Sequence, residues 1–79
     1  MHHQPMPSER VLARRRAIGA QIQAARARAG LTQEAVSLRT DIRIATISEI
    51  ETGYRAARLD SLILIADAIG VDLADLVRT

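Results

Sequence analysis

The sequence predicts an all-α fold, a compact five-helix orthogonal bundle, and three observations support this prediction. The chain has 79 residues, 48% of them apolar, and these are mostly Ala, Ile, Leu and Val. Apolar residues recur at steps of three, four and seven, which is the period of a helix buried along one face. Gly30, Gly53 and Gly70 follow the segments that have this period, as helix-terminating glycines do. Helices joined by short connections and packed on one another therefore account for most of the chain.

The first helix is predicted to begin after Ser8, which can act as its N-cap, and to continue to Ala29, with Gly30 as the C-terminal stop. One face of this segment carries small and branched apolar residues, namely Val11, Ile18, Ile22, Ala25 and Ala29. The pattern fits one long helix, and it also fits an arm followed by a helix from about Ala17. We therefore divide the chain into a flexible or helical basic N-terminal extension, residues 1–16, and a domain, residues 17–79.

The second and third helices are predicted close together. Thr32 is a good N-cap for a helix that ends at Thr40, and Asp41 falls where the turn must lie, because Asp tolerates a left-handed backbone. The third helix is expected at about 44–51, with Gly53 after it. Arg43 stands where a capping residue would be expected, so this helix should begin without a side-chain cap, at a cost of about 1 kcal/mol.

The sequence pattern predicts two more helices in the C-terminal part of the chain. Asp60 is expected to cap a fourth helix that ends before Gly70. Asp72 and Asp75 stand three apart before Leu76, as in an acidic variant of the capping box, and should start a brief fifth helix. The expected order is thus five helices without a strand.

Charge is distributed unevenly along the chain. Residues 1–58 carry ten Arg and five acidic residues, a net charge of +5, whereas residues 59–79 carry one Arg and four Asp, a net charge of −3. Every basic residue is Arg, whose forked guanidinium suits phosphate and guanine. The codon bias of a GC-rich genome is an equally good explanation for the missing Lys.

Several classes of function are excluded or made poor candidates by composition. The chain has no Cys, and its two His stand in the segment MHHQPMP, which is more typical of a tail than of a metal site. With a single ring, Tyr54, the chain lacks stacking surfaces for single-stranded nucleic acid. We expect no enzyme, no cofactor and no metal. No run is long enough to span a membrane and no secretory signal is evident, so a cytoplasmic location is expected.

Short pieces of the sequence stand at the spacing of a known family. They are Arg26, Leu31-Thr32-Gln33-Glu34, Thr46-Ile47-Ser48, Ile50-Glu51, Gly53, Leu59 with Leu62, and Ala66-Asp67-Ala68-Ile69-Gly70-Val71. Over residues 18–77 the chain resembles the helix-turn-helix domain of Cro and the phage repressors, also called the xenobiotic-response-element type. The resemblance implies a lambda-repressor-like bundle and a sequence-specific regulator, a repressor, that binds double-stranded DNA with the helix at about 44–51 in the major groove.

The resemblance also implies roles for individual residues. The base-facing candidates are Arg43, Ile44, Ala45, Thr46, Ser48 and Glu49. The phosphate candidates are Thr32, Gln33, Arg55, Arg58, Arg14, Arg15 and Arg16. Arg26 and Glu51 would form a structural ion pair. Some alternatives stay open: Ile44 can fold back on the core, Glu49 can pair with Arg55, and the arginines can form an ordinary solvated face.

Exposed apolar residues suggest a partner. In Leu62-Ile63-Leu64-Ile65, four apolar residues in a row cannot all face one core on a helix. The candidates for a dimer or partner contact are Leu38, Ile63, Leu64 and Leu76. A homodimer on paired half-sites is the first hypothesis. The alternative is an antitoxin-like or adaptor module that uses the same fold to bind another protein, a toxin or a regulator.

Overall fold

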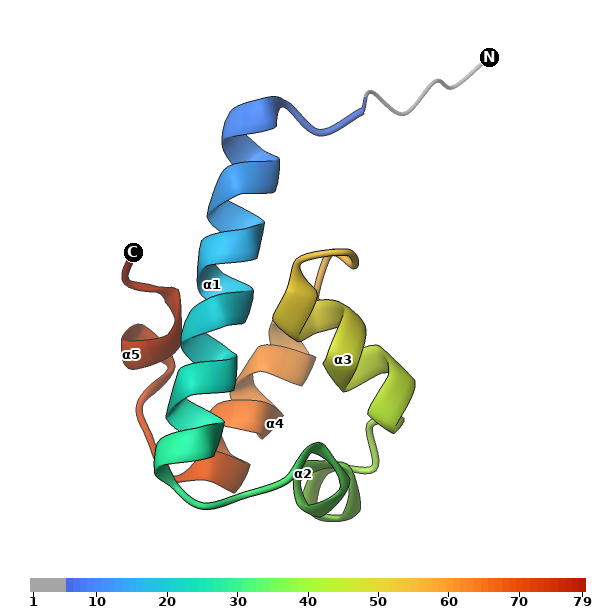
Figure 1. Cartoon of the computed structure of the whole chain (residues 1–79), viewed down its shortest axis with the longest axis vertical. Coiled ribbons are helices and arrows are strands. Elements are labelled where there is room, and N and C mark those ends of the chain that lie inside the picture. The colour runs from blue at the N-terminus through green and yellow to red at the C-terminus, as the bar shows by residue number, and fades with distance from the viewer. Residues whose placement is uncertain (1–5) are drawn as a thin grey trace.

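The computed structural model describes residues 6–79, which form five helices and no strand (Figure 1). The helices are α1 (Glu9–Arg28), α2 (Gln33–Thr40), α3 (Ile44–Thr52), α4 (Leu59–Ile69) and α5 (Leu73–Val77). The all-α, five-helix prediction is therefore confirmed. The expected tail around His2 and His3 lies outside the described residues.

The first helix is continuous, so the long helix is correct and the arm followed by a helix is not. Ser8 caps it as predicted, since its Oγ accepts a hydrogen bond from the Val11 amide at 3.2 Å. The N-terminal turns of α1 extend away from the other helices in Figure 1, whereas its C-terminal half lies between α3 and α5. The basic stretch 14–16 is thus part of a continuous helix.

The connection between α2 and α3 is fixed by short side chains. Thr32 caps α2 by accepting from the Ala35 amide at 3.0 Å. Thr40 Oγ1 accepts from the Ile42 amide at 3.1 Å, and Ser37 Oγ donates to the Ile42 carbonyl. Asp41 adopts the predicted left-handed conformation, with φ of 62°. α3 starts at Ile44 without a side-chain cap from Arg43, as expected, and ends at Gly53.

Two capping predictions are wrong. α4 begins at Leu59, so Arg58 occupies the N-cap position, two residues before the expected cap Asp60, which lies in the first turn. There the Asp60 carboxylate can still interact favourably with the helix dipole. Asp72 is at the N-cap of α5 but its side chain makes no cap hydrogen bond, because the Asp75 amide bonds to the Asp72 backbone carbonyl at 3.0 Å instead.

All five helices contribute buried side chains to one core. Its fully buried side chains are Ile22, Val36, Ile47, Ile65 and Leu76. Leu76 was predicted to contact a partner, and this prediction is wrong: α5 is a single turn whose main apolar side chain completes the core, leaving none of it exposed. The other three partner candidates do reach the surface, with Leu38 80%, Ile63 42% and Leu64 44% exposed.

We expect the Asp41→Gly variant to be more stable than the parent chain by about 0.5–1 kcal/mol. A left-handed backbone is costly for a residue with a Cβ, and the Asp41 carboxylate stands at the negative end of the α2 dipole. Urea denaturation followed by circular dichroism measures the difference. Asp41→Asn is the control, because it removes the charge but keeps the Cβ. If the Gly variant is no more stable than the Asn variant, the whole difference in stability is due to the charge of Asp41.

Candidate nucleic-acid interface

The third helix presents two different faces. Ile47, Ile50 and Glu51 are buried against the bundle. The predicted base-facing residues lie on the remaining surface: Arg43, Ile44 and Ala45 are exposed, and Thr46, Ser48 and Glu49 are half-buried. Ile44 does not fold back on the core, since 43% of it is exposed. Five of the candidates thus retain exposed surface on α3, and Arg43 is exposed immediately before the helix.

The buried Glu51 holds this helix in position. Its carboxylate, 3% exposed, receives Nε of Arg26 at 2.6 Å and Nη2 of Arg26 at 3.0 Å. Arg26 Nη1 also donates to the Leu31 carbonyl at 2.8 Å, so one guanidinium joins α1, the segment before α2, and α3. Hydrogen bonding to Glu51 raises the pKa of Arg26 above the usual arginine value, although burial opposes this. The pair thus fixes the angle at which α3 is presented.

The start of α2 is connected to the same carboxylate. Gln33 Nε2 donates to Glu51 Oε1 at 3.0 Å, which leaves one amide hydrogen and the carbonyl of the Gln33 side chain for another partner. Thr32 is exposed and uses its hydroxyl as the cap. The first amides of a helix lack intrahelical acceptors, so this end of α2 suits an anion.

A second ion pair lies at the other end of α3. Arg55 Nη2 and Nε approach Glu49 Oε1 at 2.9 and 3.0 Å, and the Arg55 amide donates to the Glu49 carbonyl at 3.2 Å. Of the alternatives for Glu49, pairing with Arg55 is the one observed. The Arg55 side chain remains 52% exposed. Glu49 is therefore already paired with a positive charge.

The remaining arginines have different surroundings, although three of them are consecutive. Arg15 is half-buried, and its Nε donates to the Gly53 carbonyl at 2.8 Å, which ties α1 to the loop after α3. Arg14, Arg16 and Arg58 are exposed. Tyr54 was not selected as a site residue, yet it is 77% exposed in this loop, beside Arg55. A lone aromatic in a basic loop was the signal available in the sequence.

Other kinds of site are not evident in the part of the chain that the structure describes. Within residues 6–79 there is no group of three His, Cys, Asp or Glu side chains that could hold a metal ion. None of the helices there has both the length and the apolar character needed to cross a membrane.

Comparison with known proteins agrees with this arrangement. A family model described as "Helix-turn-helix" matches residues 22–76, which include α2, the turn and α3. The chain therefore belongs to the helix-turn-helix family of the Cro and C1 type, whose members are DNA-binding transcription regulators. None of the curated proteins compared matches the chain.

Two solved structures have the same fold. The restriction-modification controller protein C.AhdI from Aeromonas hydrophila is 22% identical, with a TM-score of 0.78 over 81% of this chain and 97% of that one. The clp gene regulator ClgR from C. glutamicum is 25% identical, with a TM-score of 0.76 over 92% of this chain and 86% of that one. The TM-score with C.AhdI shows that the two chains share the backbone arrangement of the bundle.

Proposed function

We propose that this chain is a repressor that reads the major groove of double-stranded DNA with the solvent side of α3 and binds as a homodimer. The observation that carries the proposal is the orientation of α3. Its outer face offers Arg43, Ile44 and Ala45 to solvent, while the Arg26–Glu51 pair holds its inner face rigidly. A helix so held can enter a groove without ordering first, which limits the entropic cost of binding.

Affinity would come mainly from phosphate contacts at both ends of this surface. The α2 terminus with Thr32 and Gln33 lies at one end, and Arg55 and Arg58 follow α3 at the other. Arg14 and Arg16 are exposed on α1 and could add to the same field. Each phosphate contact releases condensed counterions, so affinity should fall steeply as salt concentration rises.

Specificity would come from a surface of unusual composition. The side chains of Ile44 and Ala45 can contact thymine methyl groups, the apolar feature of the major groove. Glu49 can accept a hydrogen bond from cytosine N4 with its second carboxylate oxygen while Arg55 holds the first. The preferred half-site should therefore contain thymines and a cytosine.

Two observations support the proposal that the chain represses as a homodimer. Half-sites about one DNA turn apart are read by two copies related by a two-fold axis, and Leu38, Ile63 and Leu64 are exposed residues that such a contact could cover. The names of the two structural neighbours describe a controller of restriction-modification and a regulator of clp genes, which supports a role in gene control. Occupying a promoter is enough to repress, whereas activation needs a further contact with the transcription machinery.

Selection of bound sequences from a random duplex library, followed by fluorescence anisotropy on the selected site, tests this proposal. Arg43→Ala should weaken binding about tenfold, on the order of one lost charged contact. Arg78→Ala is the matched control, because it removes the same charge from an exposed position at the end of the chain. Glu49→Gln should change the preferred base at one position. If no sequence is enriched, or if both Arg variants lose affinity equally, specific reading by α3 is refuted.

A protein-binding role is the second candidate, and the exposure of Leu38 favours it. A leucine 80% exposed at the outside of α2 has no function in the core. In an antitoxin-like or adaptor protein this side chain would contact a toxin or another regulator. Light scattering measures the mass, and fluorescence anisotropy measures binding to duplex DNA. A homodimer that becomes a monomer on Leu64→Glu supports the first candidate. A monomer that does not bind duplex DNA supports the second.

A further inference from the structure

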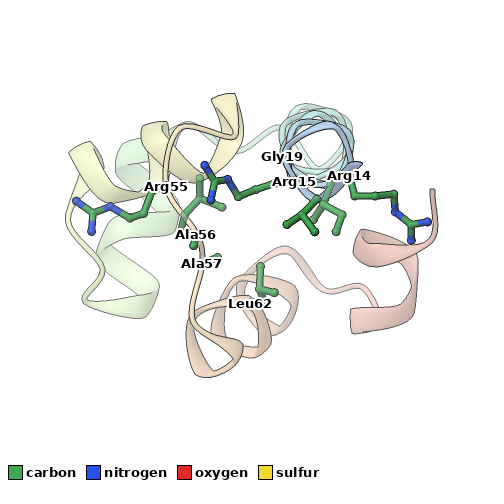
Figure 2. A pocket seen from close by; sticks show the side chains of 10 residues that line it. Arg14, Arg15, Gly19, Arg55, Ala56, Ala57 and Leu62 are labelled. Atoms are coloured by element: carbon green, nitrogen blue, oxygen red, sulfur yellow. The ribbon is translucent and has the colours of Figure 1, made fainter. Parts of the chain in front are cut away.

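A groove of about 250 Å³ lies between α1, the loop after α3 and the start of α4 (Figure 2). Most of its lining is aliphatic, and it includes Val11 and Ile18 of α1, Ala57 of the loop and Leu62 of α4. Its volume is slightly below the range of roughly 300–1,000 Å³ that is usual for drug-sized ligands. It is suited to one or two apolar side chains.

This apolar surface extends beyond the groove itself. Val11 in its lining is 46% exposed, and Leu59 of α4, three residues before Leu62 and therefore next to it on the helix, is 63% exposed. The α1 side of the groove is formed by residues that precede the segment matching the family, 22–76. Ile18, Ala57 and Leu62 are partly buried against the core, whereas Val11 and Leu59 do not pack against it and are exposed. A surface of this extent is better matched to a partner helix than to a small molecule.

The charges around the groove indicate what kind of partner fits. Its lining includes Arg14, Arg15 and Arg55 and no acidic residue. In Figure 2 the side chains of Arg14 and Arg55 extend in opposite directions from the two ends of the groove, and Arg15 lies between them. A second copy docked by a two-fold axis would bring this cationic rim against itself, which like charges oppose. An acidic partner has the complementary charge.

We propose that the groove binds an acidic amphipathic helix of another protein. Its apolar side chains would contact Ile18 and Leu62, and its carboxylates would meet the guanidinium groups at the two ends of the groove. One of these is Arg55, which also holds Glu49 on α3. A bound helix competes with Glu49 for Arg55 and leaves the Glu49 charge unbalanced beside the DNA. The docking stands on the groove alone, and only its effect on DNA rests on the proposed function.

The probe is a fluorescein-labelled amphipathic peptide of about 18 residues, with Leu along one face and Glu flanking it. Its binding is followed by fluorescence anisotropy with the full chain. One control peptide has Lys in place of Glu, and another has Ala in place of Leu. The test variant is Ala56→Glu, which adds a negative charge at an exposed residue lining the groove. Ala24→Glu, an exposed position on α1 outside the lining, is the matched variant.

The acidic peptide should bind saturably and at least about tenfold more tightly than either control peptide. Ala56→Glu should weaken it on the order of fivefold, and Ala24→Glu should not. Equal binding of the Lys and Glu peptides, or equal loss in the two variants, would overturn the proposal. The competition is tested separately: excess acidic peptide should lower DNA affinity of the parent chain. If the peptide binds but DNA affinity is unchanged, the coupling through Arg55 is wrong and the docking stands.

Discussion

Replacing Arg26 by alanine is expected to remove a large part of the folding free energy of the domain. The change leaves the buried Glu51 carboxylate with Gln33 as its remaining side-chain partner and removes the donor to the Leu31 carbonyl. Breaking one side of a buried ion pair costs about 3–5 kcal/mol. A domain of this length has a free energy of unfolding of only about 4–12 kcal/mol. Urea denaturation followed at the helical circular dichroism band measures the loss.

The second ion pair of the chain supplies the control for this prediction. Arg55→Ala breaks the Glu49 pair, where the Arg55 side chain is 52% exposed, and should cost less than about 1 kcal/mol. A double variant, Arg26→Met with Glu51→Leu, removes both buried charges and should recover much of the stability lost by Arg26→Ala. If Arg26→Ala and Arg55→Ala have similar small effects, the proposed role of the buried pair in fixing α3 is wrong.

The pH dependence of this contribution follows from the raised pKa of Arg26. A cation whose pKa is higher in the folded state stabilises fully at every pH below its unfolded value, and the effect is lost only as pH rises through the folded value. Arginine is charged at all ordinary pH values. Titration of Arg26 therefore contributes no pH dependence in the neutral range.

The helix boundaries could be predicted because they depend on neighbouring residues. Ser8 and Thr32 cap their helices through the side-chain oxygen, and Asp41 takes the left-handed turn, as expected from their chemistry alone. The capping predictions were wrong for Asp60 and Asp72. The amides that these side chains would have bound donate to backbone carbonyls instead. Such a choice depends on how the helix is positioned by its packing, and composition does not reveal it.

Exposure was harder to predict than helicity, because it depends on contacts between distant segments. Leu76 and Leu64 have similar local patterns, yet one is completely buried and the other is 44% exposed. The consecutive Arg14 and Arg15 differ likewise, since the second is anchored to the Gly53 carbonyl across 38 residues of sequence. The groove between α1 and α4 is a product of such long-range packing. Only the family resemblance gave α3 an expected role in DNA binding.

The Gly19→Ala variant is expected to be strongly destabilised, although the helix propensity of alanine predicts the opposite. In a helix interior alanine is favoured over glycine by about 1 kcal/mol. Here α1 crosses α3 at Gly19, and a Cβ would lie 2.4 Å from the Ile50 carbonyl oxygen and 2.5 Å from that of Glu51. Both are backbone atoms of α3, so no side-chain rotation relieves the contact. We expect a net loss of about 2 kcal/mol, the middle of the range for overpacked cores.

Thermal denaturation should show this loss as a fall of about 10 °C in Tm, given the small size of the domain. Ala20→Gly is the control, because Ala20 is exposed one residue further along α1 and the substitution is the reverse. It should cost about 1 kcal/mol through helix propensity alone. The two changes thus separate a local from a tertiary cause: if propensity dominated, Gly19→Ala would raise Tm and Ala20→Gly would lower it. Both variants destabilised, with Gly19→Ala the more so, requires the close crossing of α1 and α3. The added methyl group would push α3 away from α1 and so change how α3 is presented. Gly19→Ala should therefore also weaken DNA binding at temperatures where the domain is still folded.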